Sequence, residues 1–369
     1  MTARPTQPRH LRAVAAATVL VLAAVAAACG SSATSSSTSA TGGPTSRTGG
    51  TVRLLTDTAF AVSKPVLRAF EQRTGIHVDV VTAGDGVEVV NKAVLTKSDP
   101  EGDVLYGIDN NTLTVAFDNG IFVPYRSPGL ALVDPQYQLD PEHRVTPIDK
   151  ADVCVDYDVT WFRSHHLAPP RSLGDLVDPR YKGLFVTEDP TSSTPGLAFL
   201  LATIAARGSN GWQAYWKALR TNGVQVANDW TAAFYDSFSG GGGKGTKPIV
   251  VSYATDPAYA VINAKPQPSS SPIGVVDDTC YRQIEFAGVL AGARHPAAAR
   301  ALVDFLLSTP FQEDMPLEMY VQPVNRDARL PALFSSYVAR PARVLSMPAA
   351  LVGQHRQTWV EQWTNLVAR

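Results

Sequence analysis

The segment from residue 52 to residue 120 alternates between two hydrophobic patterns. Short runs rich in β-branched residues, which predict strands, are each followed by a longer segment with helical spacing. The predicted strands are 52–56, 76–82 and 102–109, and the predicted helices are 63–75, 87–98 and 111–120. Strict alternation of this kind indicates an α/β lobe with a mostly parallel sheet.

The chain then leaves this lobe. The strand predicted at 151–162 has long irregular connections on both sides, as expected of a crossing into a second lobe. The second lobe and the return to the first contain predicted strands at 184–189, 247–255 and 280–292. Predicted helices follow at 195–208, 211–223 and 350–368, and another begins at residue 295. We therefore predict one lobe from 51–150 plus 283–318 and another from 151–282 plus 319–369. Two such crossings place a cleft between the lobes, where ligands of α/β sheets gather.

The N-terminus carries arginines, an apolar run from Ala13 to Ala28, and then Cys29. This pattern is typical of a secretory signal and too short for a stable membrane span. Small residues before Cys29 predict lipoprotein processing of residues 1–29, although ordinary cleavage that leaves a free cysteine is the alternative. The Ser/Thr/Gly segment 30–50 predicts a flexible tether. We expect an exported protein anchored by lipid to the outer face of the cytoplasmic membrane.

Composition argues against a nucleic-acid surface. Only 18% of the residues are charged and the net charge is −1, so no basic stripe is available to displace the counterions of phosphates. The two other cysteines, Cys154 and Cys280, would lie in an oxidising compartment, where a pair of thiols most often forms a disulfide. The alternative is a reactive thiol.

Three polar motifs follow predicted strands and precede predicted helices. In "TAGDG", Asp85 is either the N-cap of the next helix or a carboxylate held toward a cation. In "GIDNN", Asp109 is expected to cap a helix. In "EDPTSSTPG", Ser193 or Thr194 is the N-cap and Pro195 the first helical residue, which leaves N–H groups that could bind a hydroxyl or a phosphate.

A fourth motif, "VSYATDPAYAV", places Tyr253 and Tyr259 on either side of a turn. The rings either cover the edge of a core or offer flat faces to a heterocycle or a cation. Trp230 and Tyr320 are loop aromatics of the same kind. No sequence motif indicates a metal site or a catalytic nucleophile: the glycine run 239–246 lacks the order of a phosphate-binding loop, and the adjacent histidines at 165 and 166 lack partners at metal-ligand spacing.

Taken in order, "TAGDGVEVVNKAVL", "DVLYGIDNNTL", "GIFVPY", "EDPTSSTPGLAFLL", "VVSYATDPAY" and "MYVQPVN" resemble the thiamine-binding proteins of ABC importers. The resemblance extends from about Thr51 to the C-terminus. It implies an α/β, two-lobed periplasmic-binding-protein fold of type II, whose ligand cleft lies between lobes joined by crossing strands. It further implies a monomer that is not an enzyme and needs no cofactor or metal, and that delivers thiamine or its phosphates to a membrane permease.

The resemblance also implies roles for individual residues. Asp85, followed by Gly86, would lie near the quaternary thiazolium, and Asp109 is expected at the same ligand. Ser193 and the indole N–H of Trp230 would contact the hydroxyethyl or phosphate end of the ligand.

The remaining positions are aromatic or depart from the family's pattern. Tyr253 and Tyr259 match the tyrosines of the Ser-Tyr…Ala-Tyr turn, and Tyr259 would stack on the aminopyrimidine. Tyr320 stands where enterobacterial-type members have the tryptophan that completes this sandwich. Asp57 stands where a ring normally packs beside the thiazolium, so it could strengthen cation binding or repel a phosphorylated ligand.

Two alternatives stay open at this point. The same scaffold could bind a different small ligand, such as a polyamine, ferric iron or an aminophosphonate. The chain could also be an enzyme that resembles thiaminase I, with Cys154 as its nucleophile, which a bond between Cys154 and Cys280 would exclude.

Overall fold

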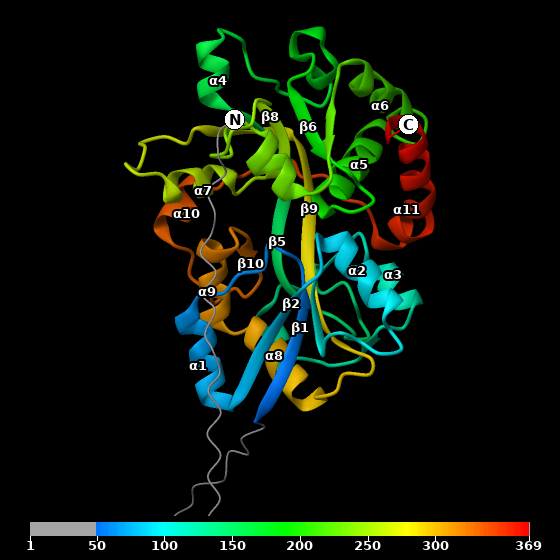
Figure 1. Cartoon of the computed structure of the whole chain (residues 1–369), viewed down its shortest axis with the longest axis vertical. Helices are drawn as coiled ribbons and strands as arrows, with labels where there is room; N and C mark the ends of the chain where they lie inside the picture. Colours follow the sequence, from blue (N-terminus) through cyan, green and yellow to red (C-terminus); the bar gives the residue numbers. More distant parts are fainter. Residues whose placement is uncertain (1–48, 369) are drawn as a thin grey trace, which may run out of the picture. The chain divides into compact units, whose positions relative to one another are not determined.

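Two long antiparallel strands form the centre of the fold in the computed structural model, which describes residues 49–368. These are β5 (Thr146–Asp158) and β9 (Ile273–Leu290), and Figure 1 shows both running through the two halves of the molecule. They pair from Thr146 opposite Ala287 to Asp158 opposite Ile273. The predicted signal peptide, Cys29 and nearly all of the predicted tether lie outside the described residues.

The sheet has the strand order β2-β1-β3-β9-β5-β8-β6-β7. The other strands are β1 (Gly50–Thr56), β2 (Ile76–Thr82), β3 (Val104–Asp109), β4 (Phe122–Val123), β6 (Phe185–Glu188), β7 (Gln225–Ala227), β8 (Ile249–Tyr253) and β10 (Gln322–Pro323). The groups β2-β1-β3 and β7-β6-β8 are each parallel, as predicted for the first lobe, whereas β9 and β5 run antiparallel to their neighbours. The carboxyl ends of the parallel strands therefore point toward the middle of the molecule.

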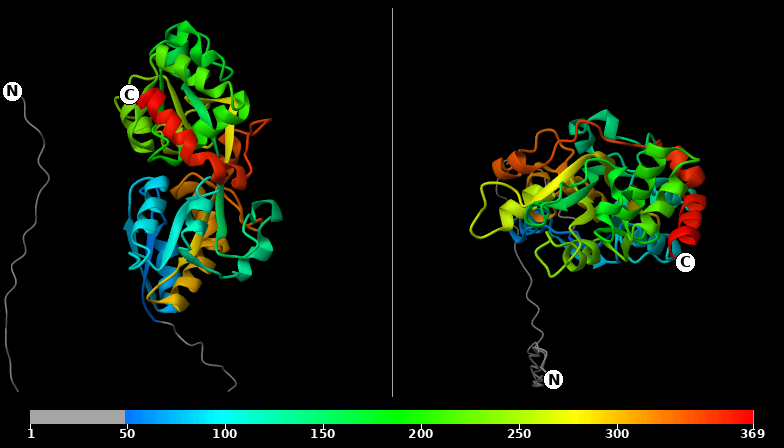
Figure 2. Two further views of the ribbon diagram at one scale, coloured as in Figure 1. Left: turned by 90° about the vertical axis from the view of Figure 1, so that its right-hand side faces the viewer. Right: turned by 90° about the horizontal axis from the view of Figure 1, so that it is seen from above.

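Helices cover both halves of the sheet (Figure 2). They are α1 (Lys64–Thr74), α2 (Gly86–Leu95), α3 (Leu113–Asp118), α4 (Val159–Ser164), α5 (Thr194–Arg207), α6 (Trp212–Thr221), α7 (Asp256–Asn263), α8 (Pro296–Leu306), α9 (Thr309–Glu318), α10 (Ala332–Tyr337) and α11 (Ala349–Trp363). Local sequence sets several of their ends. For example, Gly75 ends α1 in the left-handed conformation with φ 74°, which glycine adopts without a steric penalty, and its N–H donates to the carbonyl of Glu71.

Separate hydrophobic clusters stabilise the two halves. In one, Phe70 of α1 stacks on Phe305 of α8, and in the other Trp216 of α6 meets Trp363 of α11 edge to face. Each such buried aromatic side chain stabilises the fold by about 1.5–3 kcal/mol. The helix α11 also contacts α3, so the end of the chain touches both halves. The exact lobe boundaries given above stay a prediction.

A disulfide joins β5 to β9 through Cys154 and Cys280, as the sequence predicted. Both cysteines are fully buried. Neither sulfur is therefore available as the free thiol that a cysteine nucleophile requires.

Several predicted bounds were wrong. The strand β5 begins five residues earlier than predicted, at Thr146 rather than at 151. The strand predicted to reach residue 162 ends at Asp158, whose carboxylate accepts the N–H of Trp161 and starts the short helix α4. The return strand β9 begins seven residues earlier than predicted, at Ile273 rather than at 280. The segment read as a Thr-Asp-Pro turn is the start of helix α7, in which Pro257 occupies the first turn.

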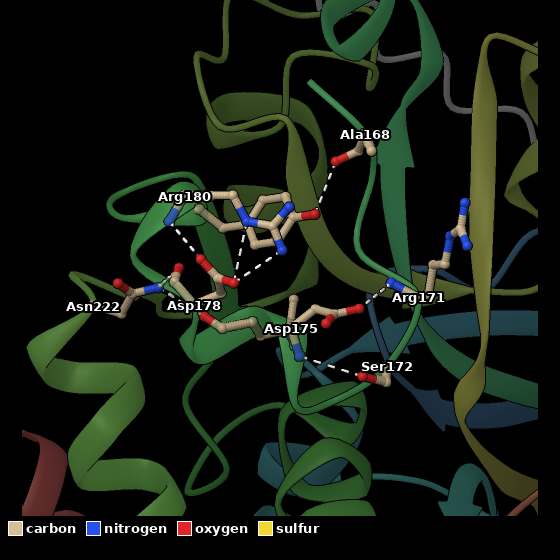
Figure 3. Close-up of polar contacts among 9 residues, drawn as sticks. Ala168, Arg171, Ser172, Asp175, Asp178, Arg180 and Asn222 are labelled. Carbon is tan, nitrogen blue, oxygen red and sulfur yellow. Dashed lines mark hydrogen bonds and ion pairs between the residues drawn. The ribbon is translucent and has the colours of Figure 1, made fainter. Parts of the chain in front are cut away.

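The connection between α4 and β6 is held by side chains that bond to the backbone (Figure 3). The amide of Asn222 donates to the carbonyls of Leu176 and Asp178, and Asp178 also pairs with Arg180 at 2.9 Å. These bonds satisfy backbone groups that the irregular connection leaves unpaired. None of these residues lines the cavity described below.

Within the described residues, no helix has the length and hydrophobicity needed to cross a bilayer.

Candidate ligand-binding site

A cavity of about 350 Å³ lies where the carboxyl ends of β1, β2 and β8 meet β9. Its walls come from segments far apart in the sequence. The lining residues are Asp57, Thr58, Ala59, Phe60, Asp85, Gly86, Tyr106, Thr194, Asp229, Trp230, Thr231, Tyr235, Tyr253, Thr255, Asp256, Tyr259, Gln283, Glu285, Glu318, Met319, Tyr320 and Val321. Six of them are acidic and seven are aromatic, and none of these described lining residues is lysine, arginine or histidine. The walls thus combine negative charge with flat aromatic faces.

The Asp85 carboxylate joins the two halves of the molecule. It is the N-cap of α2, where it accepts the N–H of Gly86 at 2.6 Å. It also accepts the N–H of Thr194 at 3.2 Å and that of Trp230 at 3.3 Å, both from the opposite half. Burial raises the pKa of Asp85, while these donors lower it. The two interpretations of Asp85 are therefore compatible, because the residue caps a helix and also lines the cavity.

Asp57 lies at the carboxyl end of β1, on the same wall. Its Oδ1 accepts the N–H groups of Ala59 at 2.7 Å and Phe60 at 3.1 Å, and its side chain is almost fully buried. Burial, followed by the nearby charge of Asp85, raises the pKa of Asp57 to about 6. This residue is ionised at neutral pH only at a cost in free energy, which a cationic ligand would offset.

Behind Asp57 lies a second group of acids that the sequence did not predict. Tyr106 of β3 donates a hydrogen bond to Asp149, and Glu285 of β9 lies beside them. Burial raises the pKa of Asp149 to about 7, and burial together with Asp149 raises that of Glu285 well above its usual range. These acids thus extend the negative character of the wall inward from Asp57.

A similar pair lies under α7. Asp256 lines the cavity, and the nearby Asp156 of β5 is fully buried. Burial raises the pKa of Asp256 to about 6, and burial and Asp256 raise that of Asp156 well above its usual range. Two buried carboxyls this close cannot both ionise without a large cost, so their proximity favours the protonated form of Asp156.

Aromatic side chains form the remaining walls. The indole N–H of Trp230 donates to Ser252 at 2.9 Å, so it is engaged by the protein itself rather than directed to a ligand. Tyr253 lies beside Trp230 with the ring centroids 6.3 Å apart. Tyr259 and Tyr320 meet edge to face at 4.9 Å, and the hydroxyl of Tyr320 accepts a bond from Asn263. A parallel sandwich around a heterocycle would require one of these two rings to rotate.

Comparison with known proteins places this architecture in a family. Residues 99–337 match the family described as "Bacterial extracellular solute-binding protein". A "Thiamine-binding periplasmic protein" of Salmonella typhimurium is 31% identical over 309 residues, which cover 82% of this chain and 88% of that protein. This chain belongs to the family of bacterial extracellular solute-binding proteins.

Further relatives agree with this assignment. The "Thiamine-binding periplasmic protein" of Escherichia coli is 30% identical over 305 residues, 82% of this solute-binding protein and 88% of the relative. The solved structure named "Periplasmic thiamin binding protein" superposes with a TM-score of 0.77 at 27% identity, covering 87% of this chain and 97% of that one. Iron-bound HitA from Pseudomonas aeruginosa, at 19% identity and a TM-score of 0.68, covers 86% of this chain and 99% of its own and shares the fold. The predicted type II periplasmic-binding-protein fold is confirmed, and the protein binds a solute outside the cytoplasm rather than catalysing a reaction.

Two of the predicted site residues of this solute-binding protein do not line the cavity. The carboxylate of Asp109 is buried and bonds to Asn111 and Thr112, as expected for a residue that shapes the turn before a helix. Ser193 is fully buried as the N-cap of α5, where its hydroxyl accepts the N–H of Gly196. Ser193 is the N-cap of α5, as the local sequence indicated, whereas the N-cap of α3 is Thr112 and not Asp109 as expected. A side-chain hydrogen bond from Ser193 also lowers the pKa of Asp85, so Ser193 supports a carboxylate of the cavity wall.

The other predicted ligand residues, Asp57, Asp85, Gly86, Trp230, Tyr253, Tyr259 and Tyr320, all line the cavity. Reasoning from sequence missed Tyr106, Asp229, Tyr235, Asp256, Gln283 and Glu285, which line it too. A signal existed for one pair: Gln283 and Glu285 are two residues apart on a predicted strand, so both point to the same face. Two polar side chains on one face of a strand indicate that this face meets a polar site.

No group of three or more His, Cys, Asp or Glu residues in the described part of the chain is arranged to hold a metal ion.

Proposed function

We propose that this protein captures thiamine and delivers it to the permease of an ABC-type importer. The observation that carries the proposal is the cavity, whose lining combines six carboxylates with seven aromatic rings and contains no basic side chain. Thiamine has matching chemistry, because its thiazolium is a permanent cation and its aminopyrimidine is a flat heterocycle. The names of the relatives, which describe thiamine-binding periplasmic proteins, support the same ligand.

In this proposal Asp85 and Asp57 face the thiazolium. A quaternary cation has no proton to lose, so carboxylates and aromatic faces must balance its charge at every pH. Cation–π attraction adds about 0.5–2 kcal/mol for a well-placed ring. Tyr259 would stack on the aminopyrimidine and Tyr320 would cover its other face once one ring has rotated.

Capture would occur by closure of two lobes, 51–150 plus 283–318 and 151–282 plus 319–369, around the crossing strands β5 and β9. The bonds from Thr194 and Trp230 to Asp85 support this mechanism, since they connect the two halves across the cavity. A ligand that touches both lobes stabilises the closed form by its differential affinity for that form. The mature protein would act as a monomer, held at the outer face of the cytoplasmic membrane by lipid on Cys29.

Isothermal titration calorimetry tests the proposal. Thiamine is titrated into the purified chain after copurified ligand has been removed by unfolding and refolding. The decisive variant is Asp85→Asn, because asparagine is as good an N-cap as aspartate and the charge is removed. The amide nitrogen also replaces one of the two oxygens that accept the N–H groups of Gly86, Thr194 and Trp230. We expect the dissociation constant of thiamine to rise by about tenfold or more, equivalent to about 1.4 kcal/mol.

The matched control is Asp99→Asn, which removes an exposed carboxylate that pairs with Arg294 away from the cavity. This variant should bind thiamine like the unmodified protein. Absence of binding in folded protein, or equal affinity in Asp85→Asn, would contradict the proposal. Binding of a polyamine or an aminophosphonate in its place would favour the alternative ligands.

A further inference from the structure

We propose that Tyr235 is a further ligand-binding residue of the cavity, and that the glycine segment 239–246 fixes its position. The proposal rests on the proposed function and adds to that site a residue that the sequence motifs did not indicate. It also gives a role to the glycine run, which lacks the order of a phosphate-binding loop. In this role Tyr235 contacts the aminopyrimidine beside Tyr259.

Tyr235 lies in a short π-helix, Ala232–Ser237, beside the cavity. The N–H of Phe238 donates to the carbonyl of Ala233 at 2.9 Å, a bond that reaches five residues back. At the other end of the helix, the carboxylate of Asp229 accepts the N–H of Ala232 at 2.8 Å. π-Helices are rare, and the single turns that occur are frequently found at functional sites. The position of this helix beside the cavity therefore points to a role in the site.

The π-helix connects the aromatic side chains of this wall. The fully buried ring of Phe234 stacks on Trp230 with the centroids 5.1 Å apart and meets Tyr259 edge to face at 5.7 Å. The next residue, Tyr235, lines the cavity, and its ring meets those of Trp230 and Tyr259 edge to face at 5.4 Å and 6.3 Å. A heterocycle stacked on Tyr259 would therefore also meet Tyr235 edge to face, an arrangement that aromatic rings favour.

The glycine segment packs directly on the backbone of Phe234 and Tyr235. A Cβ atom added to Gly241 would lie 1.9 Å from the carbonyl oxygen of Phe234, and one added to Gly243 would lie 1.9 Å from that of Tyr235. These distances leave no room for a side chain, so glycine is required for the close approach of the two backbones. The two glycines thus contact the two residues whose rings form or support the wall.

Hydrogen bonds hold both ends of the glycine segment. The N–H of Ser239, its first residue, donates to the carbonyl of Lys247, which follows its last residue, at 2.9 Å. The hydroxyl of Ser239 also donates to the carboxylate of Asp158 at 2.6 Å, and the ammonium of Lys247 donates to the carbonyl of Gly183 at 2.6 Å. Because both ends are held, the segment cannot move outward as a whole. A side chain at Gly241 would therefore displace the π-helix and the rings that it carries.

Calorimetry with the purified chain and thiamine tests the role of the ring. Tyr235→Ala should raise the dissociation constant about three- to tenfold, the loss expected for one aromatic contact, whereas Tyr235→Phe should keep most of the affinity because it keeps the ring. Tyr337→Ala, which removes a ring that does not line the cavity, should bind like the unmodified protein. Equal affinity in Tyr235→Ala would overturn this proposal and leave the proposed function intact. No binding of thiamine by the folded, unmodified protein would overturn the proposed function, and this proposal with it.

A double-mutant cycle tests the role of the glycine segment. Gly241→Ala should weaken thiamine binding, and its loss should not add to that of Tyr235→Ala, because the glycine acts through the ring. Gly242→Ala is the matched control: a Cβ there meets nothing within 4 Å, so the strain from its φ of 81° stays in the segment and the affinity should not change. If Gly241→Ala does not fold, Gly243→Ala takes its place. Unchanged binding in the folded glycine variant, or losses that add in the double variant, would overturn the positioning role.

Discussion

Asp57 should destabilise the ligand-free protein at neutral pH, and its replacement by asparagine should reveal the size of the effect. Burial and the neighbouring Asp85 raise the pKa of Asp57 from 3.8 to about 6. At 1.36 kcal/mol for each pH unit, this difference corresponds to about 3 kcal/mol. The variant Asp57→Asn removes the charge and keeps an oxygen that can accept the N–H groups of Ala59 and Phe60.

The direction of the effect with pH follows from the raised pKa. Between pH 3.8 and about 6 the folded protein holds a proton on Asp57 that the unfolded chain has lost. The contribution of this group to the free energy of unfolding therefore falls as pH rises through that range, and the whole cost is present above pH 6. At pH 8 we expect Asp57→Asn to be more stable than the unmodified protein by about 1–3 kcal/mol, since some of the gain is lost in placing the new amide group. Near pH 4 the difference should largely disappear.

Urea denaturation of both ligand-free proteins at pH 4 and pH 8 measures this difference. Excess thiamine should reverse the order at pH 8, because the unmodified protein binds the cation more tightly and gains more stability from it. The exposed replacement Asp99→Asn serves as a control that changes charge without burial. Equal stabilities of Asp57→Asn and the unmodified protein at pH 8, or the same difference at both pH values, would refute the reasoning.

Three further predictions concern the rings, the acids and the disulfide. Tyr320→Ala should weaken thiamine binding about three- to tenfold, the loss expected for one aromatic face, whereas Tyr320→Trp should retain binding in calorimetry. Thiamine affinity should fall as the pH is lowered through 6, where Asp57 and Asp256 take up protons; a profile that is flat from pH 8 to 5.5 would contradict their role. Replacing both Cys154 and Cys280 by alanine should lower the free energy of unfolding by about 2–5 kcal/mol in urea denaturation. Thiamine affinity should change little in that variant, because neither cysteine lines the cavity.

Much of the fold could be predicted from local patterns because the main elements follow simple rules. The strand β2 has the predicted bounds, and α1 ends at the glycine that its sequence indicated. The errors lie where contacts between distant segments, rather than local sequence, set the bounds of an element. The strand β9 extends beyond its predicted start because β5 pairs with the segment from Ile273, a pairing that no local pattern reveals. The helix α7 was read as a turn because its Thr-Asp-Pro start resembles one.

The candidate site likewise contains residues that local sequence could predict and residues that it could not. Residues in motifs next to strand ends, such as Asp85 and Tyr259, were predicted and line the cavity. Tyr106 also lines it but lies within a strand, where the sequence indicates burial and gives no hint of which cavity the side chain faces. Asp109 lies in a polar motif beside a strand end but is not among the residues that line the cavity, and local sequence does not show which of these motifs faces a cavity.

The acids of the cavity explain why a binding protein would retain groups that destabilise it. Burial raises the pKa values of Asp57, Asp85 and Asp256, so the ligand-free protein bears a cost in free energy for every carboxylate that stays ionised. A quaternary cation in the cavity offsets that cost without any proton transfer. Cation binding and the cost of the buried charges thus have one origin. The variants that relieve this cost, Asp57→Asn above all, should therefore be the ones that bind the cation less tightly.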